Sequence, residues 1–194
     1  MTADYNVQAS EPVMLGMGEL YLGKVDNPES ATDDTIIPAL KQIGVIDSGA
    51  SLEYAPDITE IKGGNRLGVL ARWITSEDVT FKTGIMTWVI DNLAAITPGT
   101  LTTDGSTGTK TLKIGGKTQL PVNYLRFIHH KDDGGDLIYN MYRSQVTKGF
   151  SMNFDPDKAT VVDVEFHSLA GTTAAAQADG TILEIVETFP PVTP

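Results

Sequence analysis

Residues 83–96 read TGIMTWVIDNLAAI, and this stretch decides how the rest of the chain is interpreted. Its apolar residues recur at spacings of three and four, which places Ile85, Val89, Leu93 and Ile96 on one side of a helix. The proline and glycine at positions 98 and 99 follow directly and end the run. The sequence therefore predicts an amphipathic helix over about residues 84–96, with one face to be buried against another layer.

That other layer is expected to be a sheet, because almost every other periodic stretch has a period of two. In residues 160–169, for example, Val162, Val164 and Phe166 alternate with polar residues. We expect a mainly β fold, a β-sandwich or half-barrel flanked by one helix, with a long loop at 24–41 and an extended C-terminal tail. Residues 1–194 are expected to form a single domain with a flexible N-terminal segment (1–11) and a C-terminal arm (171–194).

Turn-forming residues predict where the strands reverse. We expect bends at positions 47–49 and 75–76, a short hairpin about residues 115–116, and a hairpin of residues 124–130 and 136–143. Residues 97–109 are rich in Gly, Thr, Ser and Asp and are expected to form a flexible loop, and one more strand is expected within 181–188.

Charge and composition exclude several classes of protein. The chain has 14 Lys and Arg against 25 Asp and Glu, so its formal net charge of −11 disfavours binding to nucleic acid or anionic lipid. The absence of cysteine removes disulfides and thiolate metal sites. No apolar run approaches the roughly 18 residues of a membrane span. We expect a soluble protein made in the cytoplasm, with no membrane partner.

One motif resembles a catalytic turn. Residues 45–51, VIDSGAS, match the apolar-apolar-Asp-Ser/Thr-Gly-Ala/Ser-Ser pattern of aspartic proteases, whose chemistry needs two aspartates that share a proton. Only Asp47 stands in such a context, so a β-turn with local hydrogen bonds is the favoured interpretation. His129 and His130 are adjacent on an expected strand and therefore point to opposite faces, which argues against a shared metal ion. No catalytic residue, cofactor or metal is expected.

Two sets of apolar residues are candidates for a subunit interface. Ile36 and Ile37 lie within the long acidic loop, where a purely solvated segment would not need them. The strand at 136–143 carries apolar residues on both of its faces, which suits a sheet that continues into a neighbouring subunit. The residues of this strand that we assign to the interface are Leu137, Ile138, Tyr139, Met141 and Tyr142.

The order of these elements resembles the major tail tube proteins of tailed bacteriophages. The resemblance lies in residues 77–93 (EDVTFKTGIMTWVIDNL), 44–56 (GVIDSGASLEYAP) and 156–166 (PDKATVVDVEF). It spans roughly residues 40–170.

Membership of this family implies a β-sandwich or half-barrel flanked by one helix, assembled as hexameric rings that stack into a hollow tube. The implied location is the virion tail, assembled in the host cytoplasm. The implied partners are further copies of the chain, the tape measure and other tail proteins, a sheath protein in contractile tails, and DNA that passes through the lumen without specific binding. An acidic lumen suits this passage because it repels phosphates.

Two other classes stay open at this stage. A β-sandwich binding module, for carbohydrate or a receptor, would gather exposed aromatic residues on one face, whereas the aromatic residues here are few and scattered. A dimeric enzyme of the aspartic-protease type would depend on Asp47.

Overall fold

The computed structural model describes residues 18–44, 46–63, 68–86, 89–132, 134–152 and 160–189, and it shows a mainly β fold, as predicted. Its strands are β1 (Gly18–Gly23), β2 (Leu40–Gln42), β3 (Ile46–Lys62), β4 (Val69–Ile85), β5 (Gly99–Asp104), β6 (Thr109–Ile114), β7 (Asn123–His130), β8 (Asp136–Val146), β9 (Ser151–Met152), β10 (Val162–Ser168) and β11 (Glu184–Glu187). Its helices are the 3₁₀ turn η1 (Pro28–Ser30), α1 (Asp33–Ala39), α2 (Ile90–Ile96) and α3 (Ala174–Asp179).

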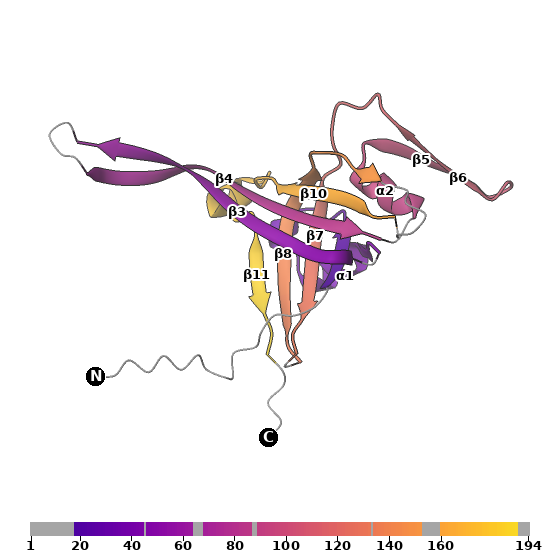
Figure 1. Ribbon diagram of the computed structural model, residues 1–194, viewed down its shortest axis with the longest axis horizontal. Coiled ribbons are helices and arrows are strands. Elements are labelled where there is room, and N and C mark those ends of the chain that lie inside the picture. The colour runs from indigo at the N-terminus through magenta and orange to yellow at the C-terminus, as the bar shows by residue number, and fades with distance from the viewer. Residues whose placement is uncertain are drawn as a thin grey trace, which may run out of the picture.

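A large antiparallel sheet forms the body (Figure 1), in the order β2-β1-β7-β8-β10-β4-β3, with β11 added to β8 and β9 added to β10. The sheet curls over its own interior. The rings of Phe81 on β4 and Phe127 on β7 are 5.2 Å apart, although β8 and β10 lie between these strands in the sheet. This curled sheet is the expected sandwich or half-barrel arrangement, and its concave face holds the core.

The core is built from alternate residues of these strands and from one helix. Leu20, Phe81, Leu125, Met141 and Phe166 have almost no exposed surface. They share the interior with Leu93 and Ile96 of α2, so this helix covers part of the core as the apolar spacing predicted.

The start of this helix was predicted wrongly. Residues 83–85 belong to β4, where Thr83 and Ile85 pair with Val164 and Val162 of β10, and α2 begins only at Ile90. Pairing on both sides of β4 overrides the helical periodicity of this stretch, which a strand buried on both faces also satisfies. The predicted end is confirmed, since α2 stops at Ile96, just before Thr97 and Pro98.

The hairpin of β7 and β8 is confirmed, whereas two of the predicted bends are irregularities within long strands. Residues 47–49 of β3 face Gly84 alone on β4, and Thr75 is an extra residue between the pairs Asp57–Ser76 and Ile58–Ile74. Such bulges use the same small and polar residues as turns, which is why the sequence signals coincide.

The second sheet was also predicted wrongly, because residues 97–109 are not a loop throughout. β5 pairs with β6 along their full lengths, and the chain turns at residues 105–108 and not at 115–116. At this turn both the hydroxyl and the backbone N–H of Ser106 donate to Asp104, at 2.6 and 2.9 Å. The side-chain hydrogen bond from Ser106 is the main cause that lowers the pKa of Asp104 to about 2.

Ser106→Ala is expected to raise the pKa of Asp104 toward its ordinary value, because the side-chain donor with the largest effect is removed. A carboxylate with a lowered pKa stabilises the turn above its unfolded pKa and loses this effect as the pH falls through its folded pKa. The turn of the wild-type chain should therefore hold until the pH approaches about 2. An NMR titration of the Asp104 carboxyl in both variants measures this, and equal midpoints would contradict the assignment.

The long loop predicted at 24–41 is largely structured. It contains η1, α1 and β2, and it folds over the outer face of β7 and β8. There the buried Arg126 donates to Asp33 of α1 at 2.5 Å and to Asn140 at 2.8 Å. The pairing of a buried guanidinium with a carboxylate and an amide fixes this segment to the body.

The predicted C-terminal arm is part of the fold as far as the structure describes it. α3 is capped by the Thr173 hydroxyl, which accepts from the Ala176 N–H, and β11 pairs with β8. Lys131 at the tip of the β7–β8 hairpin donates to Glu187 at 2.8 Å. The N-terminal segment 1–11 and residues 190–194 lie outside the described residues.

Candidate functional site

β3 and β4 extend far beyond the sheet to which they belong. β10 pairs with β4 only from Ile85 to Thr80, whereas β3 and β4 continue to pair with each other from Tyr54–Val79 out to Lys62–Val69. We call residues 54–62 and 69–78 the arm. Figure 1 shows the arm as a two-stranded ribbon that leaves the body on one side.

The arm carries apolar side chains that the rest of the described chain does not cover. Six of them are 43–57% exposed. They are Tyr54, Ile58, Ile61, Leu70, Trp73 and Ile74. An isolated two-stranded ribbon is marginally stable in water, so such a concentration of exposed apolar surface marks an interaction site.

These side chains lie on both faces of the ribbon. Ile58 and Ile74 are directly opposite each other, so they share one face. Trp73 lies opposite Thr59, and by strand alternation Ile61 shares its face, which is the other one. A partner that covers only one face would leave the second exposed, and the arm therefore fits a position between other elements.

Polar contacts hold the register of the arm. Arg72 donates to Glu60 at 2.9 Å, the Ser76 hydroxyl donates to Asp57 at 2.6 Å, and the Tyr54 hydroxyl donates to Glu77 at 2.5 Å. The hydrogen bond to Glu77 is the main cause that raises the pKa of Tyr54. These contacts support the pairing of the two strands along the ribbon.

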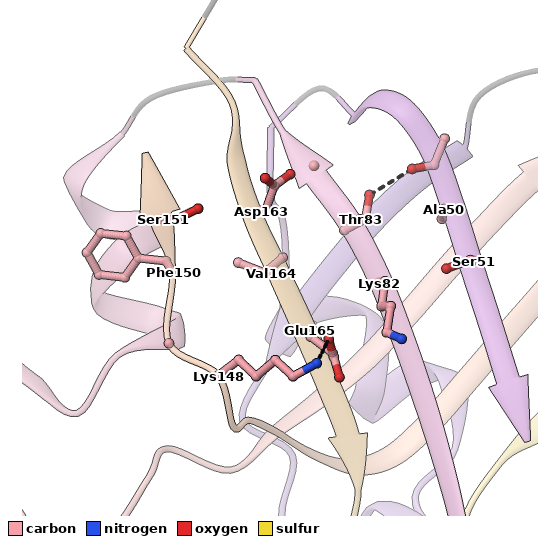
Figure 2. Close-up of a pocket in the computed structure, with 13 residues that line it drawn as sticks. Ala50, Ser51, Lys82, Thr83, Lys148, Phe150, Ser151, Asp163, Val164 and Glu165 are labelled. Atoms are coloured by element: carbon pink, nitrogen blue, oxygen red, sulfur yellow. Dashed lines mark hydrogen bonds and ion pairs between the residues drawn. The ribbon is translucent and has the colours of Figure 1, made fainter. Parts of the chain in front are cut away.

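An open groove of about 570 Å³ lies on the outer face of the sheet near the body end of β3 and β4 (Figure 2). Its charged lining comes from Lys82, Lys148, Asp163 and Glu165. Lys148 donates to Glu165 at 2.7 Å, and the Thr83 hydroxyl donates to the Gly49 carbonyl at 3.2 Å. Alternating charges on an open sheet face suit contact with another protein surface. Among the described residues that line the groove, no nucleophile and base are in hydrogen-bond contact.

Asp47, the residue of the protease hypothesis, borders the groove, whereas His129 and His130 lie elsewhere, on β7. Asp47 lies at the bulge of β3 that borders the groove, and its side chain lies outside the described residues. His129 is buried and His130 is exposed, in keeping with opposite faces of β7. His130 contacts Asp136 at 2.6 Å, and within the described residues no three metal-ligating side chains gather into a site.

Most of the predicted interface residues are instead covered by their own chain. Met141 has no exposed surface and lies in the core, and Ile36 is only 4% exposed. Ile36 lines a small pocket with Ile138 and Tyr142, where α1 covers β8. Leu137 and Tyr139 are partly buried on the core-facing side of β8. Ile37, at 58%, is the one member of the set that is well exposed.

The burial of these residues has a simple physical reason. The apolar residues on both faces of β8 do require two contact layers, but the chain supplies both of them itself. The core covers one face, and the segment that contains η1 and α1 covers the other, while β11 pairs with the edge of β8 within the sheet. Met141 and Ile36 are therefore withdrawn from the interface, and the unsatisfied apolar surface lies on the arm.

The sequence of the arm carries a signal for a long ribbon. Residues 58–61 and 70–74 combine β-branched and aromatic residues with the opposite charges of Glu60 and Arg72. Thr75 and Ser76 favour a turn, which would divide β4 into two short strands. The structure has a single bulge there, so β4 continues into a ribbon that extends beyond the body.

No helix within the described part of the chain is long and apolar enough to cross a membrane. No known protein family matches the sequence, and no curated protein sequence matches it either.

Proposed function

We propose that this protein is a structural subunit that assembles with copies of itself into stacked rings, forming the tube of a phage tail through which the genome passes. The observation that carries the proposal is the arm, which projects from the body with exposed apolar residues on both faces. A second copy of the chain is its partner.

Burial of the arm by a second subunit would contribute free energy to assembly. Complete burial of one large apolar side chain contributes about 1.5–3 kcal/mol. The six arm residues are about half exposed, so covering them contributes roughly 1 kcal/mol each. Each subunit in a ring stack would make this contact twice. Its own arm would pack on one neighbour, and the arm of another neighbour would pack on it.

The edge of the sheet supports lateral contacts within a ring. β3 is the last strand of the sheet order, so within the described residues one side of its 17-residue backbone has no strand partner. An edge of this length pairs readily with another chain. Closure into a ring would satisfy it and remove the risk of open-ended aggregation.

Charge supports the passage of DNA. The formal net charge of −11 disfavours adhesion of phosphates to the wall of a tube. The tape measure, a sheath protein and other tail proteins are further partners under this proposal. The virion tail is its location.

A carbohydrate-binding module is the less favoured alternative. Tyr54 and Trp73 are the exposed aromatic residues of the arm, but strand alternation places them on opposite faces. They therefore do not form a common platform for stacking on a sugar.

Negative-stain electron microscopy of the purified chain, with sedimentation velocity over a range of concentrations, tests the proposal. We expect rings or tubes of uniform diameter with a central channel, and a sedimentation coefficient that rises with concentration. A particle that stays monomeric at the highest concentration would refute self-assembly.

A further inference from the structure

The root of the arm is fixed to the body by the end of β10. The Val79 N–H donates to the Ser168 hydroxyl oxygen at 3.0 Å, and His167 Nδ1 lies 2.8 Å from Asp78 Oδ2. These contacts stand where β10 stops pairing with β4, at His167–Thr80. We call the four residues Asp78, Val79, His167 and Ser168 the arm anchor.

His167 faces carboxylates through both ring nitrogens. Nδ1 contacts Asp78, and Nε2 lies 3.1 Å from Glu165 Oε1. Only the protonated imidazole carries a hydrogen on each nitrogen, so only this form donates to both carboxylates at once. Glu165 keeps a second donor in either form, because Lys148 contacts its other oxygen at 2.7 Å.

Loss of the proton affects the two carboxylates unequally. If the neutral ring keeps the hydrogen on Nε2, it still donates to Glu165, and Nδ1 accepts from the Thr80 hydroxyl at 3.4 Å. That hydroxyl otherwise donates to Asp78 at 3.3 Å. In the opposite tautomer the lone pair of Nε2 would face the Glu165 carboxylate. The first tautomer gives each ring nitrogen a partner, and it removes both donors from Asp78.

The surrounding charges do not replace these donors. Glu165 lies on the same strand as His167, and Lys148 lies on the segment between β8 and β9. Lys82 of β4 lies opposite Glu165 in the strand pairing, and its ammonium contacts Glu53 of β3. Glu53 is itself the strand partner of Thr80. On β8, the uncharged Gln145 is opposite His167. Both lysines are thus engaged with glutamates, and among the described side chains Asp78 depends on His167 and Thr80 for donors.

We propose that His167 is a pH-sensitive anchor, which holds the arm in a fixed direction when it is protonated and frees the arm root when it is neutral. The direction follows from the contact, since a proton that strengthens the anchored state favours that state at low pH. Histidine changes its protonation between about pH 5 and 8. An arm held in its binding direction loses less conformational freedom on docking, so assembly should be tighter at the acidic end of this range.

The effect on the arm is tested on a monomer, by NMR of a chain with substitutions Ile58→Thr, Trp73→Thr and Ile74→Thr that remove arm contacts. The imidazole ¹⁵N spectrum, followed over a range of pH, distinguishes the doubly protonated ring from the Nε2–H tautomer. Relaxation of the arm amides should show increased motion at the higher pH. His167→Gln in the same background should abolish this pH dependence, whereas the matched control His130→Gln, at a histidine that contacts Asp136 far from the arm, should preserve it.

The effect on assembly rests on the proposed function and is measured separately. The critical concentration of the unaltered chain should rise about tenfold from pH 5.5 to 8. This rise is measured relative to His167→Gln, in which all the other ionisable groups still change their charge with pH. Arm motion that is independent of pH, or equally dependent in His167→Gln, would overturn the anchor. A pH-dependent arm in a chain that never assembles would instead uphold the anchor and refute the proposed function.

Discussion

Replacing Ile58, Trp73 and Ile74 together by threonine is expected to raise the critical concentration for assembly by about 100-fold. The three side chains are exposed on the arm, and each contributes roughly 1 kcal/mol if a second subunit covers it. A total of about 3 kcal/mol corresponds to two powers of ten in an association constant. Threonine keeps the preference for strand conformation, so the ribbon itself should persist.

The folded monomer should be almost unaffected by this triple substitution, because substitutions at exposed positions usually change stability by less than about 0.5 kcal/mol each. Sedimentation and light scattering give the critical concentration, and circular dichroism with urea unfolding checks the fold. The matched control is a chain with Ile114→Thr and Ile185→Thr, two exposed residues away from the arm. Equal assembly of the two variants would show that the arm is not the contact surface.

Phe81→Ala is expected to lower the free energy of unfolding by about 3–5 kcal/mol, which is a large part of the 5–15 kcal/mol typical of a folded domain. Phe81 is 1% exposed, and its ring lies 5.2 Å from that of Phe127 and 6.5 Å from that of Phe166. Its removal leaves a cavity where the two halves of the curled sheet meet. The rigid strands on both sides cannot close such a space.

Urea unfolding of this variant, with the slope compared against the wild type, measures the loss. Phe189→Ala is the control, because Phe189 is largely exposed and contacts the Lys131 ammonium at 5.1 Å from the ring centroid. The control should lose no more than about 1 kcal/mol. A comparable loss in both variants would mean that Phe81 does not join the halves of the sheet as described.

The parts of the fold that were predicted correctly are those that local sequence determines. β7 and β8 are joined by residues that favour a turn, and β10 has the clearest period of two. The start of α2 and the positions of the bulges were not predictable in this way. They depend on pairing with strands distant in sequence, such as that of Ile85 with both Val162 and Ile46.

The predicted interface residues also depend on tertiary structure that the local sequence does not determine. The sequence indicates that Met141 and Ile36 need to be buried, but it does not say whether their own chain or a neighbour covers them. The composition of the arm indicates strands, but it does not indicate that Ile and Trp are exposed there, since both are equally typical of a core. Their exposure follows from the length of β3 and β4 relative to β10, which is a property of the whole sheet.

The connectivity of the sheet also bears on the order of folding. β3 and β4 are consecutive in the chain, so their pairing requires only local contacts. The pairs β1–β7 and β4–β10 join strands that are distant in the sequence. Local contacts form faster than distant ones, for which a long loop must first close. The ribbon of β3 and β4, with its exposed apolar residues, is therefore synthesised before β7, β8 and β10 of the body. Nascent chains on the same messenger RNA would then be prone to associate through this ribbon before they have folded. A chaperone that covers the ribbon would prevent this premature association.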